Sequence, residues 1–164
     1  MVFPNGIELY IKREDLLHPI ISGNKFRKLK YNLEEAKKLG FKKILTFGGA
    51  FSNHIVAVAG AGVAFGFETI GVIRGEELID KVQENPSLAF AQQNGMRFHF
   101  VDRTTYRDKS DKKFVESLHD LYGDFYLIPE GGTNQLAIKG CEEIFLHNLF
   151  YFEKHKKPII YQTQ

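Results

Sequence analysis

The sequence of 164 residues has one cysteine, no tryptophan and almost no net charge. The single cysteine, Cys141, excludes an internal disulfide and favours a reducing compartment such as the cytoplasm. Because 22 basic residues nearly balance 20 acidic ones, a nucleic-acid partner would require basic side chains gathered on one face, and we expect none. Hydrophobic residues make up 43% of the chain, which excludes a disordered protein.

Signals for secretion and for a membrane are also lacking. The N-terminus has neither the basic nor the apolar region of a signal peptide. Residues 44–67 carry no charged side chain and are numerous enough to span a bilayer, but they include five glycines and the polar trio Ser52-Asn53-His54. A strand, a Gly-Gly turn and a buried helix of small residues explain this stretch better, so we expect no membrane partner.

Short apolar segments alternate with helical ones along the chain. The first helix is expected to follow the turn at 22–24 and to end at Gly40. Strands are then predicted at 44–47, 69–73, 96–101 and 125–128, separated by helices at 53–65, 87–94 and 114–122. This alternation predicts an α/β fold, with a three-layer open parallel sheet and helices on both faces.

The two ends of the chain lie outside this pattern. A strand is expected at 8–12, a long helix at 135–154 and another strand at 158–161. Segment 103–113 is expected to be a solvated, charged connector. Because the first strand has no sheet of its own and nothing follows the last one, both ends are interpreted as pieces of a second domain.

The first of three glycine-containing turns places Lys25 at the start of a helix. The helix dipole and the nearby Arg27 and Lys28 disfavour the charged form of this lysine. A neutral lysine can attack a carbonyl group, which is what a Schiff-base lysine requires. From its spacing alone, however, a solvated surface lysine is the simpler interpretation.

The other two turns, at 48–54 and 129–134, each precede a helix. Backbone N–H groups at such a helix start favour an anion such as a carboxylate or phosphate. The alternative is simple capping, by Ser52 or Asn53 in one turn and by Thr133 or Asn134 in the other. Neither turn has the G-x-G-x-x-G spacing of a dinucleotide site, and the scattered histidines favour no metal site.

Four motifs occur in a characteristic order. They are Ile11-Lys12-Arg13-Glu14-Asp15, Gly23-Asn24-Lys25-Phe26-Arg27-Lys28-Leu29, Gly48-Gly49-Ala50-Phe51-Ser52-Asn53-His54 and Pro129-Glu130-Gly131-Gly132-Thr133-Asn134. Together they resemble the 1-aminocyclopropane-1-carboxylate deaminase / D-cysteine desulfhydrase family. This resemblance implies the tryptophan synthase β-like fold of pyridoxal 5'-phosphate enzymes, in which a small α/β domain is inserted in a larger one. It divides the chain into a large-domain segment with the cofactor lysine (1–31), a small domain (32–128) and the start of the rest of the large domain (129–164).

The resemblance also implies a role for each motif. Lys25 would bind pyridoxal 5'-phosphate covalently and later move the substrate proton. Asn53 would lie against the cofactor ring and bond its phenolic oxygen. Ser52, with the amides of Asn53 and His54, would hold the substrate carboxylate. His54 is closer to desulfhydrase-like members, since deaminases more often have glutamine there.

The implied substrate is a small amino acid of the D-cysteine or 1-aminocyclopropane-1-carboxylate type. A lyase reaction, by elimination or ring opening, would release ammonia and a 2-oxo acid, together with sulfide from D-cysteine. The family's glycine-rich phosphate loop should follow the strand at 158–161, where the given sequence ends. We therefore expect this chain to be the N-terminal part of a longer enzyme, truncated and inactive or impaired by itself, because a cofactor phosphate without its cradle loses several charge-assisted hydrogen bonds.

Two interpretations from other functional classes stay open. The chain can be a non-catalytic remnant that binds an anion or a partner chain, since uncovered apolar surface would favour association, for example as a homodimer. It can also be a stand-alone nucleotide-binding α/β domain, although neither Gly-Gly turn has the spacing of a phosphate loop.

Overall fold

The computed structural model describes residues 4–6 and 9–155 and is built on a parallel sheet. Four strands pair in the order β3-β2-β1-β4, all parallel. Their bounds are Lys43–Gly48 for β1, Glu68–Arg74 for β2, Arg97–Val101 for β3 and Tyr126–Ile128 for β4. The predicted open parallel sheet is therefore confirmed, with each strand within a residue or two of its predicted position.

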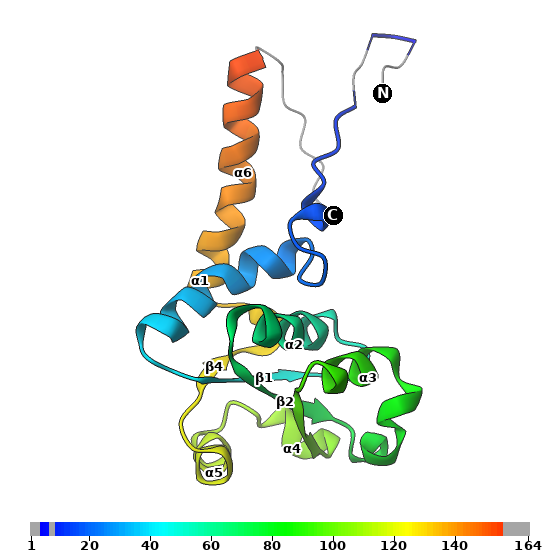
Figure 1. Ribbon diagram of the computed structural model, residues 1–164, viewed down its shortest axis with the longest axis vertical. Coiled ribbons are helices and arrows are strands. Elements are labelled where there is room, and N and C mark those ends of the chain that lie inside the picture. The colour runs from blue at the N-terminus through cyan, green and yellow to red at the C-terminus, as the bar shows by residue number, and fades with distance from the viewer. Residues whose placement is uncertain (1–3, 7–8, 156–164) are drawn as a thin grey trace.

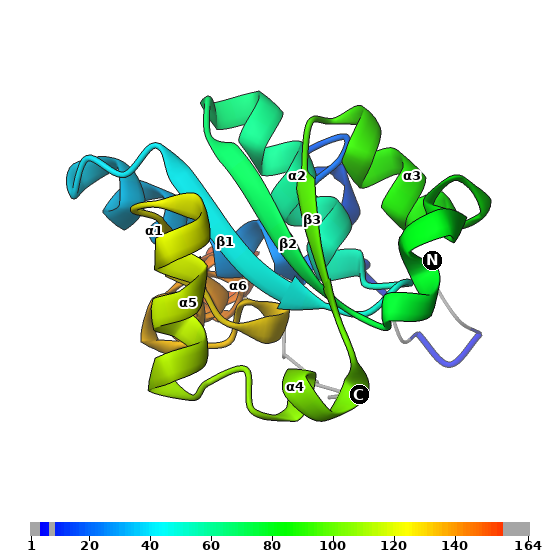
Figure 2. The same cartoon turned by 90° about the horizontal axis from the view of Figure 1, so that it is seen from below.

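Helices cover both faces of this sheet, as predicted (Figure 2). One face carries α2 (Asn53–Phe65) and α3 (Pro86–Gln93), and the other carries α4 (Arg103–Arg107) and α5 (Lys112–Tyr122). The long helix α6 (Gln135–His155) packs on α1 (Asn24–Lys38) and extends away from the sheet (Figure 1). Short 3-10 helices lie at Glu14–Leu16 (η1), Glu76–Glu84 (η2) and Glu130–Gly132 (η3).

Alternation of side chains along each strand produces two hydrophobic clusters. Ile44 and Ile73 belong to the cluster on the α2 side, whereas Leu45 and Val72 belong to the cluster with Leu118 of α5. Successive residues of a strand point to opposite faces, and here both faces are covered. The strands therefore have near-continuous apolar sequences, as expected of a parallel sheet between helical layers.

Glycines in α2 permit close packing. A Cβ added at Gly60 would lie 2.4 Å from the Ile20 side chain, and one at Gly62 would lie 2.6 Å from that of Thr69. The uncharged stretch 44–67 is therefore a strand, a turn and a buried small-residue helix, as predicted. Within the described part of the chain, no helix is long and apolar enough to cross a membrane.

Two predictions of secondary structure were wrong. Residues 9–12 form no strand, since they pair with no strand among the residues that the structure describes, and Ile11 is 74% exposed. The expected solvated connector at 103–113 contains α4, which begins because Asp102 accepts hydrogen bonds from the amides of Thr104 (2.7 Å) and Thr105 (3.0 Å). Residue 8 and the strand predicted at 158–161 lie outside the described residues.

A buried arginine joins α1 to α6 and to η1. Arg27, which is 5% exposed, donates from Nε to Glu14 (2.9 Å) and from Nη1 to Glu143 (2.8 Å). Burying a charge is costly unless it is paired, and both carboxylates supply that pairing. This ion-pair cluster fixes the helix on which Lys25 lies.

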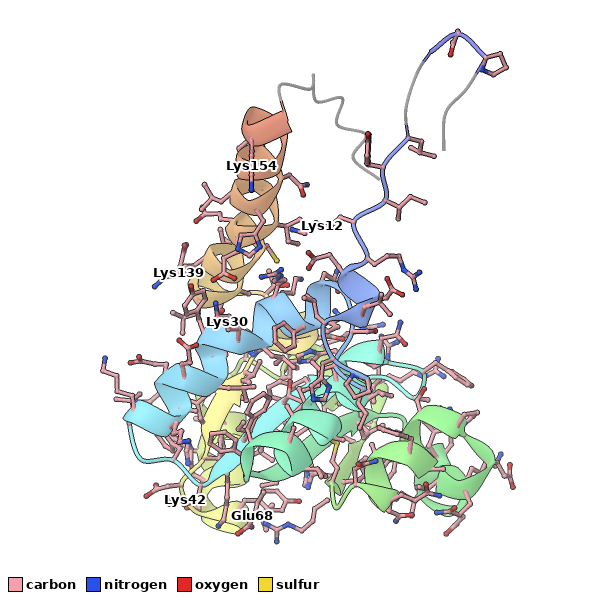
Figure 3. The ribbon with its side chains drawn as sticks, turned by 45° about the horizontal axis from the view of Figure 1, so that its top comes forward. Lys12, Lys30, Lys42, Glu68, Lys139 and Lys154 are labelled. Carbon is pink, nitrogen blue, oxygen red and sulfur yellow. The ribbon has the colours of Figure 1, made fainter. Side chains whose placement is uncertain are left out.

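The α1–α6 contact is close enough to require glycine at one point. A Cβ at Gly140 would lie 2.0 Å from the Arg27 carbonyl oxygen. Beside this contact, Lys30 of α1 and Lys139 of α6 lie over the ring of Tyr31, with Nζ 4.8 and 4.3 Å from its centroid (Figure 3). The two helices therefore approach backbone to backbone, with the cation–aromatic group at their edge.

We predict that Gly140→Ala destabilises the chain by about 1–3 kcal/mol, because the added methyl group forces α1 and α6 apart. In a helix without this contact the same change would stabilise by up to about 1 kcal/mol, so even the sign is informative. Urea unfolding measures the effect, with Glu142→Ala on the exposed side of α6 as control. Unchanged or increased stability of Gly140→Ala would contradict the observed packing.

Glu143 should make the chain sensitive to acid. Hydrogen bonds from Lys30 and Tyr31 lower the pKa of Glu143 from 4.5 to about 2. A lowered carboxyl pKa stabilises the folded state above pH 4.5, and this contribution is lost as the pH falls towards 2. Over that interval the wild type should lose up to about 3 kcal/mol more unfolding free energy than Glu143→Gln. Glu142→Gln is the matched control. If the unfolding free energies of the wild type and Glu143→Gln fall in parallel as the pH is lowered, the prediction is refuted.

Candidate active site

Lys25 lies in the first turn of α1, which begins at a glycine in an unusual conformation. Gly23 is the N-cap, with φ of 59°, a value that side chains other than glycine rarely adopt. The half-buried Lys25 donates from Nζ to the Gly131 carbonyl oxygen at 3.4 Å. Its pKa is lowered, as predicted, first by burial and then by the charge of Lys28. Burial in the folded chain is thus the main cause of the shift.

The loop between β1 and α2 presents a helix N-terminus. Ser52 is the N-cap of α2, and its Oγ accepts a hydrogen bond from the Ile55 amide at 3.3 Å. The capping interpretation of Ser52 is therefore correct, yet its hydroxyl proton remains free to be donated. Helix geometry leaves the amides of Asn53 and His54 without intrahelical acceptors. This terminus retains donors for an anion.

Lys25 and Asn53 line the same pocket. This pocket has a volume of about 250 Å³ and lies between the start of α1 and the start of α2. Its other lining residues come from the turn before α1, from the 20–22 segment and from the second turn of α2: Ile20, Ser22, Gly23, Asn24, Val56 and Ala57. Two residues that were predicted from separate motifs therefore lie beside one cavity.

The third glycine turn, at 129–134, contacts Lys25 and His54. The Gly131 carbonyl accepts from both Lys25 and Lys28, each at 3.4 Å, and Lys28 also donates to Thr133 Oγ1 at 3.0 Å. Gly132 packs against the ring of His54, where a Cβ would lie 3.1 Å from Cε1. The three turns, far apart in sequence, thus converge around Lys25 and His54. Asn134 caps α6 by accepting from the Ala137 amide at 2.9 Å, so the capping interpretation of this turn is also correct.

His54 is held in one tautomer by a buried chain of hydrogen bonds. Thr46 Oγ1 donates its only proton to the Ile128 carbonyl (2.8 Å), so it must accept from His54 Nε2 (2.8 Å). His54 Nδ1 then carries a lone pair, and it has no hydrogen-bond partner within the described part of the chain. Burial, with the charges of Lys25 and Lys28, lowers the pKa of His54 from 6.5 to about 3. The ring is therefore neutral at physiological pH.

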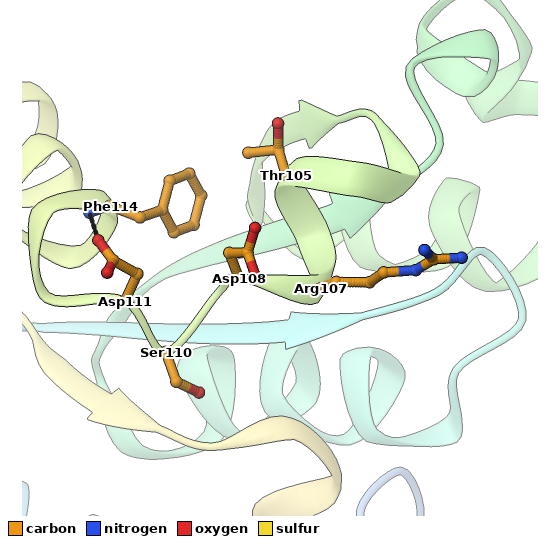
Figure 4. Close-up of a pocket in the computed structure, with 6 residues that line it drawn as sticks. All are labelled: Thr105, Arg107, Asp108, Ser110, Asp111 and Phe114. Carbon is orange, nitrogen blue, oxygen red and sulfur yellow. Dashed lines mark hydrogen bonds between the residues drawn. The ribbon is translucent and has the colours of Figure 1, made fainter.

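Sequence reasoning missed two contributors to this site. Thr46 was treated only as part of a strand, although a hydroxyl at an inward position of an apolar strand indicates a buried hydrogen bond. Lys28 was expected only to repel the charge of Lys25, and its hydrogen bonds to Gly131 and Thr133 were missed, although its spacing of three from Lys25 places both on one helix face. A pocket of about 500 Å³ near the start of α5 contains neither Lys25 nor Ser52 (Figure 4). There Asp111 caps α5 by accepting from the amides of Lys113 and Phe114.

Comparisons with known proteins agree with the four motifs. A provisionally named 1-aminocyclopropane-1-carboxylate deaminase of Thermotoga maritima is 34% identical over 139 residues, which cover 82% of this chain and 43% of that protein. The bifunctional D-cysteine desulfhydrase/1-aminocyclopropane-1-carboxylate deaminase of Arabidopsis thaliana is 30% identical, covering 85% of this chain and 36% of that protein. The D-cysteine desulfhydrase of Serratia proteamaculans is 28% identical, covering 82% and 42%. The chain therefore spans about two fifths of the length of these relatives, and no protein-family model matches it.

Solved structures agree on the fold. The crystal structure of a 1-aminocyclopropane-1-carboxylate deaminase homologue matches with a TM-score of 0.63 and 29% identity, over 79% of this chain and 39% of that one. A threonine deaminase, with a TM-score of 0.51 and 22% identity, shares the fold. These matches confirm the predicted fold class, a small α/β domain of the tryptophan synthase β-like type. The chain is therefore a relative of the 1-aminocyclopropane-1-carboxylate deaminase / D-cysteine desulfhydrase family, and its partial coverage fits the N-terminal part of such a protein.

Proposed function

We propose that the chain is part of a pyridoxal 5'-phosphate-dependent enzyme that releases ammonia and a 2-oxo acid from a small amino acid. D-cysteine and 1-aminocyclopropane-1-carboxylate are the substrate types that the named relatives favour. One observation carries the proposal: a half-buried lysine of lowered pKa lines a pocket together with Asn53, next to the capped N-terminus of α2.

The residues present fit this cofactor. Covalent attachment requires a lysine that loses its proton readily, and burial of Lys25 provides it. The nearby charge of Lys28 suits an anionic cofactor. When bound, pyridoxal phosphate withdraws electrons from the substrate α-carbon, while the protein determines orientation and protonation.

The chain's own groups then have separate tasks. Lys25 Nζ, once neutral, accepts and returns the substrate proton. The Ser52 hydroxyl and the amides of Asn53 and His54 hold the substrate carboxylate at the positive end of α2. The side chain of Asn53, on the Lys25 side of this helix end, orients the cofactor ring.

The absence of charge on the His54 ring also contributes to this arrangement. A charged imidazolium beside Lys25 and Lys28 would add a third positive charge to the same cluster. Desolvation and the Thr46 hydrogen bond keep the ring neutral, so Nδ1 offers a lone pair toward the lysine side of the site. We therefore propose that His54 positions groups at this site and does not itself exchange protons.

We also propose the division of the chain into large-domain segments at 1–31 and 129–164 and a small domain at 32–128. The long helix α6, which packs on α1 and extends away from the sheet, supports it (Figure 1). In this arrangement Lys25 belongs to one domain and Ser52 to the other. The pocket that Lys25 shares with Asn53 would then lie at the boundary between the domains.

Labelling tests the role of Lys25. The chain is incubated with pyridoxal phosphate and reduced with borohydride, and the modified peptides are located by mass spectrometry. We expect Lys25 to carry most of the label, because it is half-buried and its pKa is lowered. Lys25→Ala should lose at least about tenfold of the specific label, corresponding to about 1.4 kcal/mol in binding free energy.

Lys42→Ala, beyond the far end of α1 and just before β1 (Figure 3), is the matched control and should label like the wild type. Label spread evenly over surface lysines, and unchanged by Lys25→Ala, would overturn the assignment. That result would favour the alternative of a non-catalytic, anion- or partner-binding chain.

NMR tests the state of His54. Nitrogen chemical shifts should show an imidazole protonated on Nε2 that does not titrate between pH 5 and 8, because its pKa is lowered to about 3. Thr46→Val should remove the preference of His54 for protonation on Nε2, because Nε2–H loses its acceptor. It should also lower the unfolding free energy by about 1–3 kcal/mol. A His54 ring that titrates near its ordinary pKa of 6.5 would contradict the buried hydrogen-bond chain.

A further inference from the structure

A second, larger pocket lies at the carboxyl ends of the strands. It has a volume of about 820 Å³ and is lined by the β1–α2 loop, by Arg74 at the end of β2, and by α4. Ser52 borders it, but Lys25 and Asn53 do not, so it is distinct from the pocket described above. Ligands of open α/β sheets commonly bind outside the carboxyl ends of the strands.

The charges around this pocket do not cancel. Arg103 pairs with Glu77 at 3.2 Å, and Lys109 pairs with Glu130 at 3.2 Å. The two remaining cations, Arg74 and Arg107, have no carboxylate within 4.0 Å among the residues that the structure describes. Two guanidinium groups therefore face a cavity without a counter-ion from the chain itself.

A buried hydroxyl group is a second feature of this pocket that suits a ligand with oxygen acceptors. Tyr106, which is 3% exposed and lines the pocket, has a hydroxyl group without a hydrogen-bond partner in the described part of the chain. Burial raises the pKa of this phenol, and so does the Glu130 carboxylate, which lies near the hydroxyl but outside the geometry of a full hydrogen bond, so the hydroxyl keeps its proton. A ligand oxygen closer to the hydroxyl than Glu130 would give this buried donor a full hydrogen bond.

Arg74 is the residue that connects these observations. Its guanidinium lies over the Tyr106 ring, with Cζ 5.6 Å from the centroid. Its Nη2 would also be 3.7 Å from a Cβ at Gly49, so the side chain extends across the end of the sheet from β2 to the β1–α2 loop. Arginine is suited to this place because its planar guanidinium binds a carboxylate or phosphate through two parallel hydrogen bonds.

We propose that this pocket is a second ligand site, in which Arg74, Arg107 and Tyr106 bind the carboxylate or phosphate group of a small anionic molecule. The two guanidinium groups supply the charge, and the Tyr106 hydroxyl supplies a donor. Arg103 and Lys109 remain occupied by their own carboxylates and form the rim. The site does not depend on the cofactor that Lys25 is proposed to bind.

Calorimetric titration of the chain, without pyridoxal phosphate, tests the site. Inorganic phosphate and succinate are the two probes. We expect saturable one-to-one binding of at least one of them, and the tighter probe identifies the group that the site prefers. Arg74→Gln should weaken that binding about tenfold or more, and Tyr106→Phe about three- to tenfold.

Arg97→Gln is the matched control, since it removes the same charge from the opposite end of the sheet, where Arg97 pairs with Glu68. It should change binding less than twofold. The proposal is overturned if neither probe binds saturably, or if Arg74→Gln and Arg97→Gln weaken binding equally. Because Lys25 labelling is a separate measurement, failure here and failure of the proposed function can be told apart.

Discussion

The buried guanidinium of Arg27 is the contact on which the arrangement of the site depends. It binds a carboxylate from η1 and another from α6, so three segments far apart in sequence meet at one charge. Lys25 precedes it by two residues on the same helix. The position of the Lys25 amine is therefore determined by an ion-pair cluster that does not line its pocket, and removing one partner would leave an uncompensated buried charge.

A second, neutral network attaches the sheet to the site. Thr46 of β1 connects the Ile128 carbonyl of β4 with the His54 ring of α2. The strand, the helix and the turn that carries Gly131 therefore keep a fixed relative position, and Gly132 has no Cβ to press against the imidazole. Precise placement of catalytic groups requires such supporting contacts behind them.

Periodicity and capping signals located most of the fold from sequence. The helix predicted at 53–65 has the observed bounds, because Ser52 caps it and Gly66 ends it in a left-handed conformation. Residues 9–12 alternate like a strand, but a strand needs a pairing partner, which is a tertiary property. The helix at 103–107 was missed because its stability comes from one cap and from burial of Tyr106. The motifs predicted that Lys25, Ser52, Asn53 and His54 form a site, which stays a prediction, whereas the pairing of Thr46 with His54 required knowledge of how the strand faces α2.

The carbonyl oxygen of Gly131 has a consequence for the charge state of Lys25. Two ammonium groups, those of Lys25 and Lys28, donate to this one acceptor, but Lys28 has a second acceptor in Thr133 and Lys25 has none described beside it. A carbonyl oxygen has two lone pairs and can accept from both lysines, so the turn holds their two positive charges close together. The repulsion between these two charges disfavours the charged form of Lys25, so the turn contributes to the lowered pKa of this amine.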